Sequence, residues 1–397
     1  MKILSVVGAR PNFVKIAPFV RAIQKYNLLN PLDNIDHVLV HTGQHYSDRL
    51  SYRFMQELNL PQPDINLSIG SGSHAEQLGK TMIAFEKTLQ VVQPDWVVVV
   101  GDVNAVLSCS VVARKDNYKI CHIEAGLRSG DYTMPEEVNR IIADRMSDLL
   151  LTHDRISIEN LKKEGIPETH IRFVGNIMID TLEEIRAKAS RLDRCAVVKN
   201  NVYHQRKSDK DTFPLIQTGE FVLMTLHRPS NVEHPETLKS LVRLISEEIC
   251  KEMVVVWTVH PRTEKNLKES GLWKILEEQK NLLLVKPIMY SEMLCLNMSA
   301  RAMLTDSGGL QEECTVLGTP CLVLRNNTER PVTLLECGGT CILAKNQTEN
   351  IRRSDHSRKH EHYHNGMPTV LAHKLRCDDA NPGKEKDHNG QFKCYSR

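Results

Sequence analysis

Short apolar runs alternate with longer amphipathic stretches along most of this 397-residue chain. Five apolar runs in the first half predict strands at residues 3–7, 37–42, 95–100, 119–123 and 148–152. Helices are predicted among them at residues 14–26, 46–58, 75–92, 105–116 and 136–147. This alternation is typical of βαβ units, whose strands form a parallel sheet. The pattern therefore predicts an α/β protein.

The same alternation resumes after a polar stretch at residues 186–219, which we interpret as a domain junction followed by a loop. The second set of strands is predicted at residues 221–226, 253–258, 282–286, 302–305 and 320–324. Its helices are predicted at residues 235–250, 263–279, 291–299 and 310–317. We therefore expect two doubly wound, Rossmann-like domains, at residues 1–175 and 176–350. Ligands bind at the carboxyl ends of such sheets, so both sheets should face one cleft.

Residues 351–397 differ from the rest of the chain. Apolar residues are sparse there, and no period of 2 or 3.6 is present, so this segment is predicted to be a disordered tail. His360, His362 and His364 alternate within it, in a pattern that a transition metal could use. We interpret them as part of a polar run, and we expect no metal site.

Charge and apolar run length exclude several classes of protein. Lys and Arg total 51 against 49 Asp and Glu, which argues against a nucleic-acid protein held mainly by charge. The apolar runs fall short of the ~20 residues that a membrane-spanning helix needs. The first run, at residues 3–7, is also too short for the core of a signal peptide. The 11 cysteines lie mostly in apolar segments and are expected to be reduced. We therefore expect a cytoplasmic protein without nucleic-acid or membrane partners.

The segment from Gly8 to Lys15 follows the first predicted strand and is a candidate phosphate contact. Gly8 permits a tight turn, and Pro11 suits the first turn of a helix, where free N–H groups attract anions. Arg10 and Lys15 add positive charge. The segment is neither a GxGxxG fingerprint nor a P-loop. The alternative interpretation is therefore a plain turn with solvated basic side chains.

Three carboxylates lie at the ends of predicted strands or at the start of a predicted helix, where they are candidates for catalysis. Asp102 and Glu124 each follow a predicted strand, where a side chain faces the expected cleft. Glu136 follows a proline at the start of a predicted helix. The alternatives are structural: Asp102 as a helix N-cap, and Glu136 as a partner of the helix dipole or of Arg140 one turn later.

The second half of the chain carries matching candidates. His227 follows the strand predicted at residues 221–226. Three small residues after the strand at 302–305 would let helix amides approach a phosphate, namely Ser307, Gly308 and Gly309. Glu313 could accept hydrogen bonds from ribose hydroxyls, and Arg325 adds another cation. Each feature alone fits turn chemistry, but their shared position at strand ends indicates a site.

Together these motifs resemble the non-hydrolysing UDP-N-acetylglucosamine 2-epimerase family, which has a GT-B-like fold. The resemblance covers about residues 1–350 and depends on a combination of motifs: GARPNFVK, HTGQHY, GDVNA, HIEAGLRSGD, MPEEVNR, LHRPSNV, HPRT and LTDSGGLQEE followed by NTERPVT. Family members usually finish with a Gly-rich segment and a helix that packs across the first domain. No such pattern follows Asn350.

The resemblance implies interconversion of UDP-GlcNAc and UDP-ManNAc, by elimination of UDP to 2-acetamidoglucal and its re-addition. It implies that Asp102, Glu124 and Glu136 supply the carboxylates, without saying which is base or acid, and that His227 contacts the phosphates. Contacts with the nucleotide sugar are implied for Arg10, Lys15, Ser307, Gly308, Gly309, Glu313 and Arg325. The resemblance further implies a homodimer, no cofactor, and a second UDP-GlcNAc near Gln44 and His45.

Several alternatives remain open. A hydrolysing relative would release ManNAc and UDP, and another relative would act on a 2,3-diacetamido uronic-acid sugar nucleotide. A glycosyltransferase of similar fold fits less well, because three carboxylates around one sugar suit elimination better than transfer. The non-enzymatic alternative is a protein that binds nucleotide sugars without turnover.

Overall fold

The computed structural model describes residues 1–43 and 48–345, except for the side chains of Arg10 and of residues 48–51 and 207–208. The predictions for Gln44, for His45 and for the tail at 351–397 lie outside the described residues.

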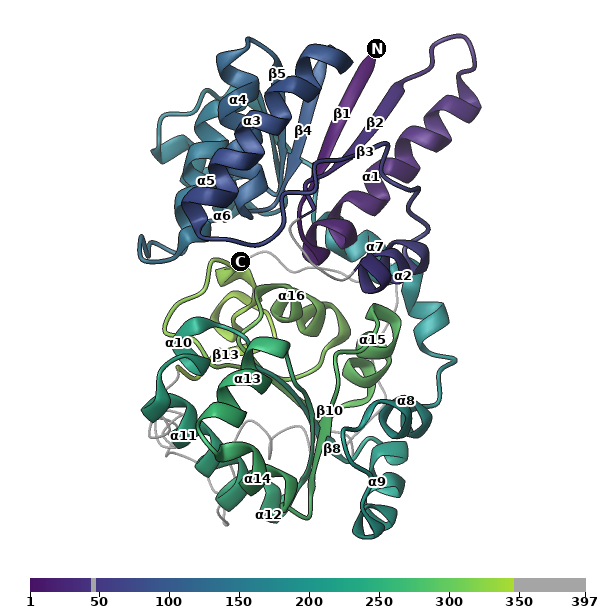
Figure 1. Cartoon of the computed structure of the whole chain (residues 1–397), viewed down its shortest axis with the longest axis vertical. Helices are drawn as coiled ribbons and strands as arrows, with labels where there is room; N and C mark the ends of the chain where they lie inside the picture. Colours follow the sequence, from purple (N-terminus) through teal and green to yellow (C-terminus); the bar gives the residue numbers. More distant parts are fainter. Residues whose placement is uncertain (44–47, 346–397) are drawn as a thin grey trace.

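The first half of the chain forms one seven-stranded parallel sheet in the order β3-β2-β1-β4-β5-β6-β7 (Figure 1). Its strands are β1 (Lys2–Val7), β2 (Asp36–His41), β3 (Ile65–Asn66), β4 (Trp96–Val100), β5 (Lys119–Ile123), β6 (Leu149–Thr152) and β7 (Ile171–Phe173). Its helices are α1 (Arg10–Leu29), α2 (Asp48–Glu57), α3 (His74–Val92), α4 (Asn104–Lys115), α5 (Pro135–Met146) and α6 (Arg155–Lys163). The chain winds outward from β1 in both directions, as in a doubly wound sheet.

Both faces of this sheet are buried. Successive residues of a strand point to opposite faces, so one strand contributes to two core clusters. Leu4 of β1 belongs to a core cluster with Phe85 of α3. Val7 of the same strand belongs to a second cluster, with Phe13 of α1. The predicted strands and helices of this half are confirmed to within a few residues.

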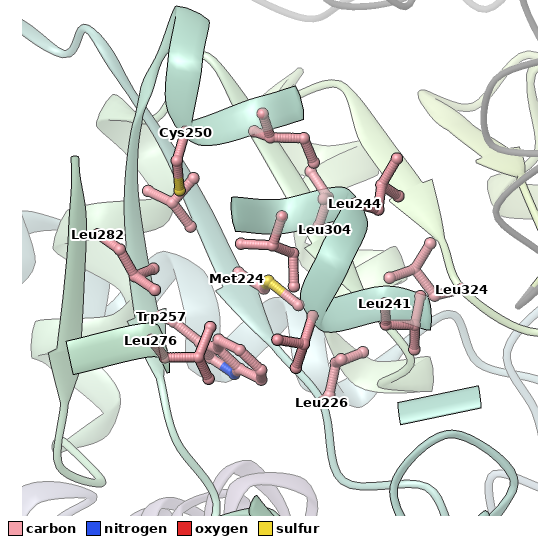
Figure 2. Close-up of a cluster of buried hydrophobic side chains, with 14 of the residues drawn as sticks. Met224, Leu226, Leu241, Leu244, Cys250, Trp257, Leu276, Leu282, Leu304 and Leu324 are labelled. Atoms are coloured by element: carbon pink, nitrogen blue, oxygen red, sulfur yellow. The ribbon is translucent and has the colours of Figure 1, made fainter. Parts of the chain in front are cut away.

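The second half forms a six-stranded parallel sheet in the order β10-β9-β8-β11-β12-β13. Its strands are β8 (Phe221–Thr225), β9 (Val254–Thr258), β10 (Leu282–Val285), β11 (Ala302–Thr305), β12 (Cys321–Val323) and β13 (Cys341–Leu343). Its helices are α10 (Pro229–Val232), α11 (Pro235–Leu244), α12 (Cys250–Glu252), α13 (Pro261–Glu269), α14 (Leu272–Glu277), α15 (Tyr290–Ser299) and α16 (Gly308–Leu317). Figure 2 shows one of its cores, where Met224 and Trp257 pack among leucines from neighbouring strands and helices.

The loop expected within residues 186–219 is largely helical, so this part of the prediction was wrong. It holds the end of α7 (Ile177–Ala189), then α8 (Arg194–Asn201) and α9 (Phe213–Thr218). Val198 and Phe213 are buried there with residues of the second sheet. These apolar residues are too few to produce a visible helical period, yet they suffice to fix short helices against a large core.

One of the predicted long helices is divided in two, and another changes its hydrogen-bond pattern along its length. The helix expected at 263–279 is divided into α13 and α14, because Gly271 adopts a left-handed conformation with φ of 71°. The helix expected at 235–250 is continuous: α11 passes at Leu244 into a π-helical turn, Ile245–Ile249, and then into α12.

Helices α7 and α15 connect the two halves. Leu182 of α7 and Leu294 of α15 share a core cluster with Phe13 of α1. Figure 1 shows the two halves following one another along the long axis of the molecule, with α7 at the junction between them. The boundary between residues 175 and 176 stays a prediction, because α7 packs on both halves.

None of the described helices has the length and apolarity to cross a membrane. The nine cysteines of the described residues are all free thiols, as predicted.

Candidate active site

Glu124 lies at the centre of a charged cluster between the two halves. It directly follows β5 and adopts a left-handed φ of 72°, which is uncommon for a residue with a side chain. Its Oε2 contacts the Lys15 ammonium of α1, and its Oε1 accepts a hydrogen bond of 2.9 Å from Arg330. All three side chains are buried. Lys15, predicted as a phosphate contact, is therefore held at a carboxylate.

The charges around Glu124 keep it ionised. Burial alone would raise the pKa of this carboxyl group, but Lys15, Arg330 and His153 lower it to about 2. Glu124 is therefore a fixed negative charge at neutral pH, in this arrangement of the two halves.

Asp102 lies beside Glu124, at the end of the neighbouring strand. Its Oδ2 accepts a hydrogen bond of 2.6 Å from Arg140 of α5, and 20% of its side chain is exposed. Gly101 precedes it with φ of 75°, and a Cβ there would lie 3.1 Å from the Lys15 ammonium. The alternative of a helix N-cap is wrong, because Val103 is the N-cap of α4.

Glu136 approaches the same cluster from the start of α5. Its carboxylate lies 3.4 Å from Arg228 of the second half, and 35% of its side chain is exposed. The ion pair considered between Glu136 and Arg140 does not form. Arg140 is instead buried, and its guanidinium group pairs with the carboxylates of Asp102 and Glu137.

His227 follows β8 and is fixed by Asp306. Its Nδ1 lies 2.9 Å from Asp306 Oδ1. Asp306 is fully buried and also accepts hydrogen bonds from the backbone N–H groups of His227 and Arg228 and from Asn231. Burial would raise the pKa of Asp306, but His227 and these donors lower it to about 2. The carboxylate is therefore ionised, which leaves Nε2 as the ring atom for other partners.

The first turn of α16 forms the edge of the site on the second sheet. Ser307 is its N-cap residue. A Cβ on Gly308 would collide with the side chains of Arg330 and Glu329. A Cβ on Gly309 would meet the flexible side chain of Met178, at 3.1 Å from its terminal methyl group. Glycine at position 308 therefore lets charged side chains pack against the helix backbone.

Glu313 and Arg325 lie in the same region. Glu313 is buried on α16, and this burial raises the pKa of its carboxyl group to about 8, while the Tyr290 hydroxyl acts to lower it. Arg325 follows β12 and donates a hydrogen bond of 2.6 Å to Glu329. Its Nη1 is buried without a hydrogen-bond partner in the described part of the chain. Such a group is a natural donor to an anionic ligand.

Comparison with known proteins identifies the family. The family model described as UDP-N-acetylglucosamine 2-epimerase matches residues 28–369. A UDP-N-acetylglucosamine 2-epimerase of Methanocaldococcus jannaschii is 40% identical over 354 residues, which are 89% of this chain and 91% of that protein. The chain belongs to the UDP-N-acetylglucosamine 2-epimerase family.

Other relatives refine the comparison within the epimerase family. The crystal structure of the M. jannaschii UDP-GlcNAc 2-epimerase in complex with UDP-GlcNAc and UDP superposes with a TM-score of 0.79, at 38% identity. The match covers 96% of this chain and 99% of that chain. A UDP-2,3-diacetamido-2,3-dideoxy-D-glucuronate 2-epimerase of Pseudomonas aeruginosa is 34% identical over 345 residues, 86% of this chain and 88% of that protein. The predicted family and the predicted GT-B-like fold class are confirmed.

Most of the predicted site residues of this epimerase-family chain meet at one junction. The backbone of Arg10 begins α1, but its side chain lies outside the described part of the chain. The roles assigned to all of these residues stay predictions. A metal-binding group of His, Cys, Asp or Glu is not found among the residues described.

Sequence reasoning missed Arg330. This side chain is buried and contacts the carboxylates of Glu124, Glu312 and Glu329. Its signal was available, because Glu329 and Arg330 both belong to the NTERPVT motif that carries the resemblance. Nothing in that motif, however, indicates that the arginine reaches the opposite half of the molecule.

Proposed function

We propose that this protein interconverts UDP-N-acetylglucosamine and UDP-N-acetylmannosamine by changing the configuration at C2. The proposal depends on one observation above all. Three carboxylates, each beside a cation, lie between the two halves, opposite a helix N-terminus that suits a pyrophosphate. The family match and the substrate named for the M. jannaschii relative support the same substrate class.

The chemistry proceeds by elimination and re-addition of UDP. Breakage of the C1–O bond leaves positive charge on the sugar ring, which makes the C2 hydrogen easier to remove. A carboxylate takes this proton while UDP leaves with the bonding electrons, giving 2-acetamidoglucal. Protonation at the opposite face of C2 and return of UDP to C1 complete the reaction. Atoms and electrons balance, because UDP and one proton are removed from the sugar and UDP and one proton are returned to it.

The three carboxylates suit different roles. Glu124 is a weak base, because its pKa is about 2, but its buried charge can stabilise a cationic ring. Asp102 and Glu136 are partly exposed and come from different elements. We assign proton transfer at the two faces of C2 to this pair.

The leaving group is stabilised from the second half of the molecule. Backbone N–H groups of the first turn of α16 favour negative charge. Arg325 has a buried donor without a partner in the part of the chain described, and His227 has Nε2 available beyond its pair with Asp306. These donors would neutralise charge that develops on the departing pyrophosphate.

Proton NMR of UDP-GlcNAc with the purified protein in D2O tests the proposal. Formation of UDP-ManNAc, with deuterium at C2 of both sugars, is the expected result. Free ManNAc and UDP would instead identify a hydrolysing enzyme. Because the P. aeruginosa relative is named for a diacetamido uronate, a UDP-2,3-diacetamido uronic acid is the second substrate to try. Binding of UDP without turnover of either sugar would contradict an enzymatic role.

Assembly and location follow as lesser parts of the proposal. We infer a homodimer, for which α3 offers the exposed apolar side chains Ile83 and Val91. We also infer a cytoplasmic enzyme that supplies ManNAc units for surface polysaccharide. Light scattering on the purified protein tests the dimer.

A further inference from the structure

His122 is a fully buried histidine whose two ring nitrogens both face acceptors. It lies on β5, two residues before Glu124. Its Nε2 lies 2.8 Å from the carbonyl oxygen of Gly101, at the end of the neighbouring strand β4. Its Nδ1 lies 2.7 Å from Asp144 Oδ1 on α5. The side chains of His122 and Asp144 are each 0% exposed.

This geometry determines where the protons are. A carbonyl oxygen only accepts, so Nε2 must carry a proton. Asp144 accepts hydrogen bonds at its other oxygen, of 3.1 Å from the Gly126 N–H and 2.8 Å from Arg128. Burial alone would raise the pKa of Asp144, but His122 and Arg128 hold it below its usual value. With an ionised carboxylate opposite it, Nδ1 must also donate.

The pair connects the three elements that carry the proposed carboxylates. Through Nε2, His122 holds the carbonyl group of Gly101, the residue directly before Asp102. Through Asp144, it holds the N–H group of Gly126, two residues after Glu124. Asp144 itself belongs to α5, the helix that also carries Glu136 in its first turn. The two hydrogen bonds of His122 therefore link β5 to β4 and to α5.

We propose that the hydrogen-bonded pair of His122 and Asp144, with both ring nitrogens of His122 donating, positions the backbone around Asp102, Glu124 and Glu136. Neither residue touches the reacting sugar in this scheme, so both are positioning residues. The kinetic part of the inference rests on the proposed function, whereas the charge state of His122 does not. The ring has no free nitrogen and so takes no part in proton transfer. It differs in this from His227, whose Nε2 remains available.

NMR of the wild-type protein tests the charge state directly. Protein labelled with ¹⁵N-histidine at neutral pH is compared with the His122→Gln variant, which assigns the His122 signals. The expected result is two ring nitrogens of the protonated type, each bearing a slowly exchanging proton. An unprotonated ring nitrogen at this position would overturn the inference. This measurement needs no substrate.

Kinetics test the positioning role. His122→Gln and Asp144→Asn are each expected to lower kcat on the order of 10- to 100-fold, as loss of an orienting partner commonly does. KM and the Kd for UDP should change less than about threefold, because UDP is held by the second half. The double variant should lose no more than the worse single variant, since both residues act through one contact.

His37→Gln is the matched control. His37 lies on β2 of the same sheet and contacts Ser5. Within the part of the chain that the structure describes, it forms no hydrogen bond or ion pair with the three carboxylates of the proposed active site, so its replacement should leave kcat unchanged. Unaltered kcat in His122→Gln would overturn the positioning role, and so would equal losses in both histidine variants. If the wild-type protein shows no epimerase activity, the proposed function fails, and the NMR result still decides whether the pair is ionised.

Discussion

Replacement of Glu313 by glutamine is expected to stabilise the protein, and to do so more strongly as the pH rises. Glu313 is buried on α16, and burial raises the pKa of its carboxyl group from 4.5 to about 8. The folded protein therefore holds a proton here that the unfolded chain releases above pH 4.5. Stability from this group is complete below pH 4.5, and it is lost as the pH rises through 8.

The magnitude follows from the two pKa values. Each pH unit between them costs about 1.4 kcal/mol, so wild-type Glu313 lowers stability by roughly 3 kcal/mol at pH 7. The cost reaches about 5 kcal/mol above pH 8. Glutamine has the shape of the protonated carboxyl group and does not titrate. The Glu313→Gln variant should therefore match the wild type near pH 4.5 and exceed its stability at pH 8.

Urea denaturation at several pH values between 4.5 and 8.5 measures this difference. Trp257 and Trp273 are buried in the second half of the molecule, so their fluorescence reports on its unfolding. Glu336→Gln, at an exposed position, is the control whose stability relative to the wild type should not vary with pH. A Glu313→Gln variant whose advantage is the same at every pH would refute the argument.

Four further results are expected. Gly308→Ala should weaken UDP binding at least tenfold by calorimetry and Gly309→Ala much less, because only the first Cβ meets charged side chains; equal effects would contradict this. Arg330→Met should lower the free energy of unfolding by about 3–5 kcal/mol in urea titrations, since it leaves buried carboxylates without their partner; a neutral effect would mean that the network relaxes. His227→Ala should cut turnover while circular dichroism stays unchanged, and wild-type rates would remove it from the mechanism. Prolonged treatment with EDTA should leave epimerisation intact, and loss that Mg²⁺ or Zn²⁺ restores would reveal a metal.

Local sequence determined most of the architecture. Apolar runs such as 96–100 are continuous because both faces of a parallel sheet are covered, and this signal does not depend on distant residues. The positions of Asp102, Glu124 and His227 at strand ends followed from the same pattern, because side chains there must face the ligand edge of the sheet. The motifs around them were sufficient to identify the family.

Partners of the charged side chains were decided only by the tertiary structure. Lys15 was expected at a phosphate and pairs with Glu124, whereas Arg140 was considered for Glu136 and pairs with Asp102 and Glu137. Lys15 and Glu124, and likewise Arg140 and Asp102, are far apart in the chain, and a charge interacts with whichever opposite charge the fold brings near.

The same reason explains Arg330 and the helices at 186–219. Arg330 reaches across from the second half to Glu124, a contact that no local pattern encodes. Helices α8 and α9 are short, and they are held by burial of a few apolar residues against a core built elsewhere in the chain. Sequence therefore determined which elements form and where their functional ends lie. Packing of the two halves determined which charges meet there, and with them the protonation states available for chemistry.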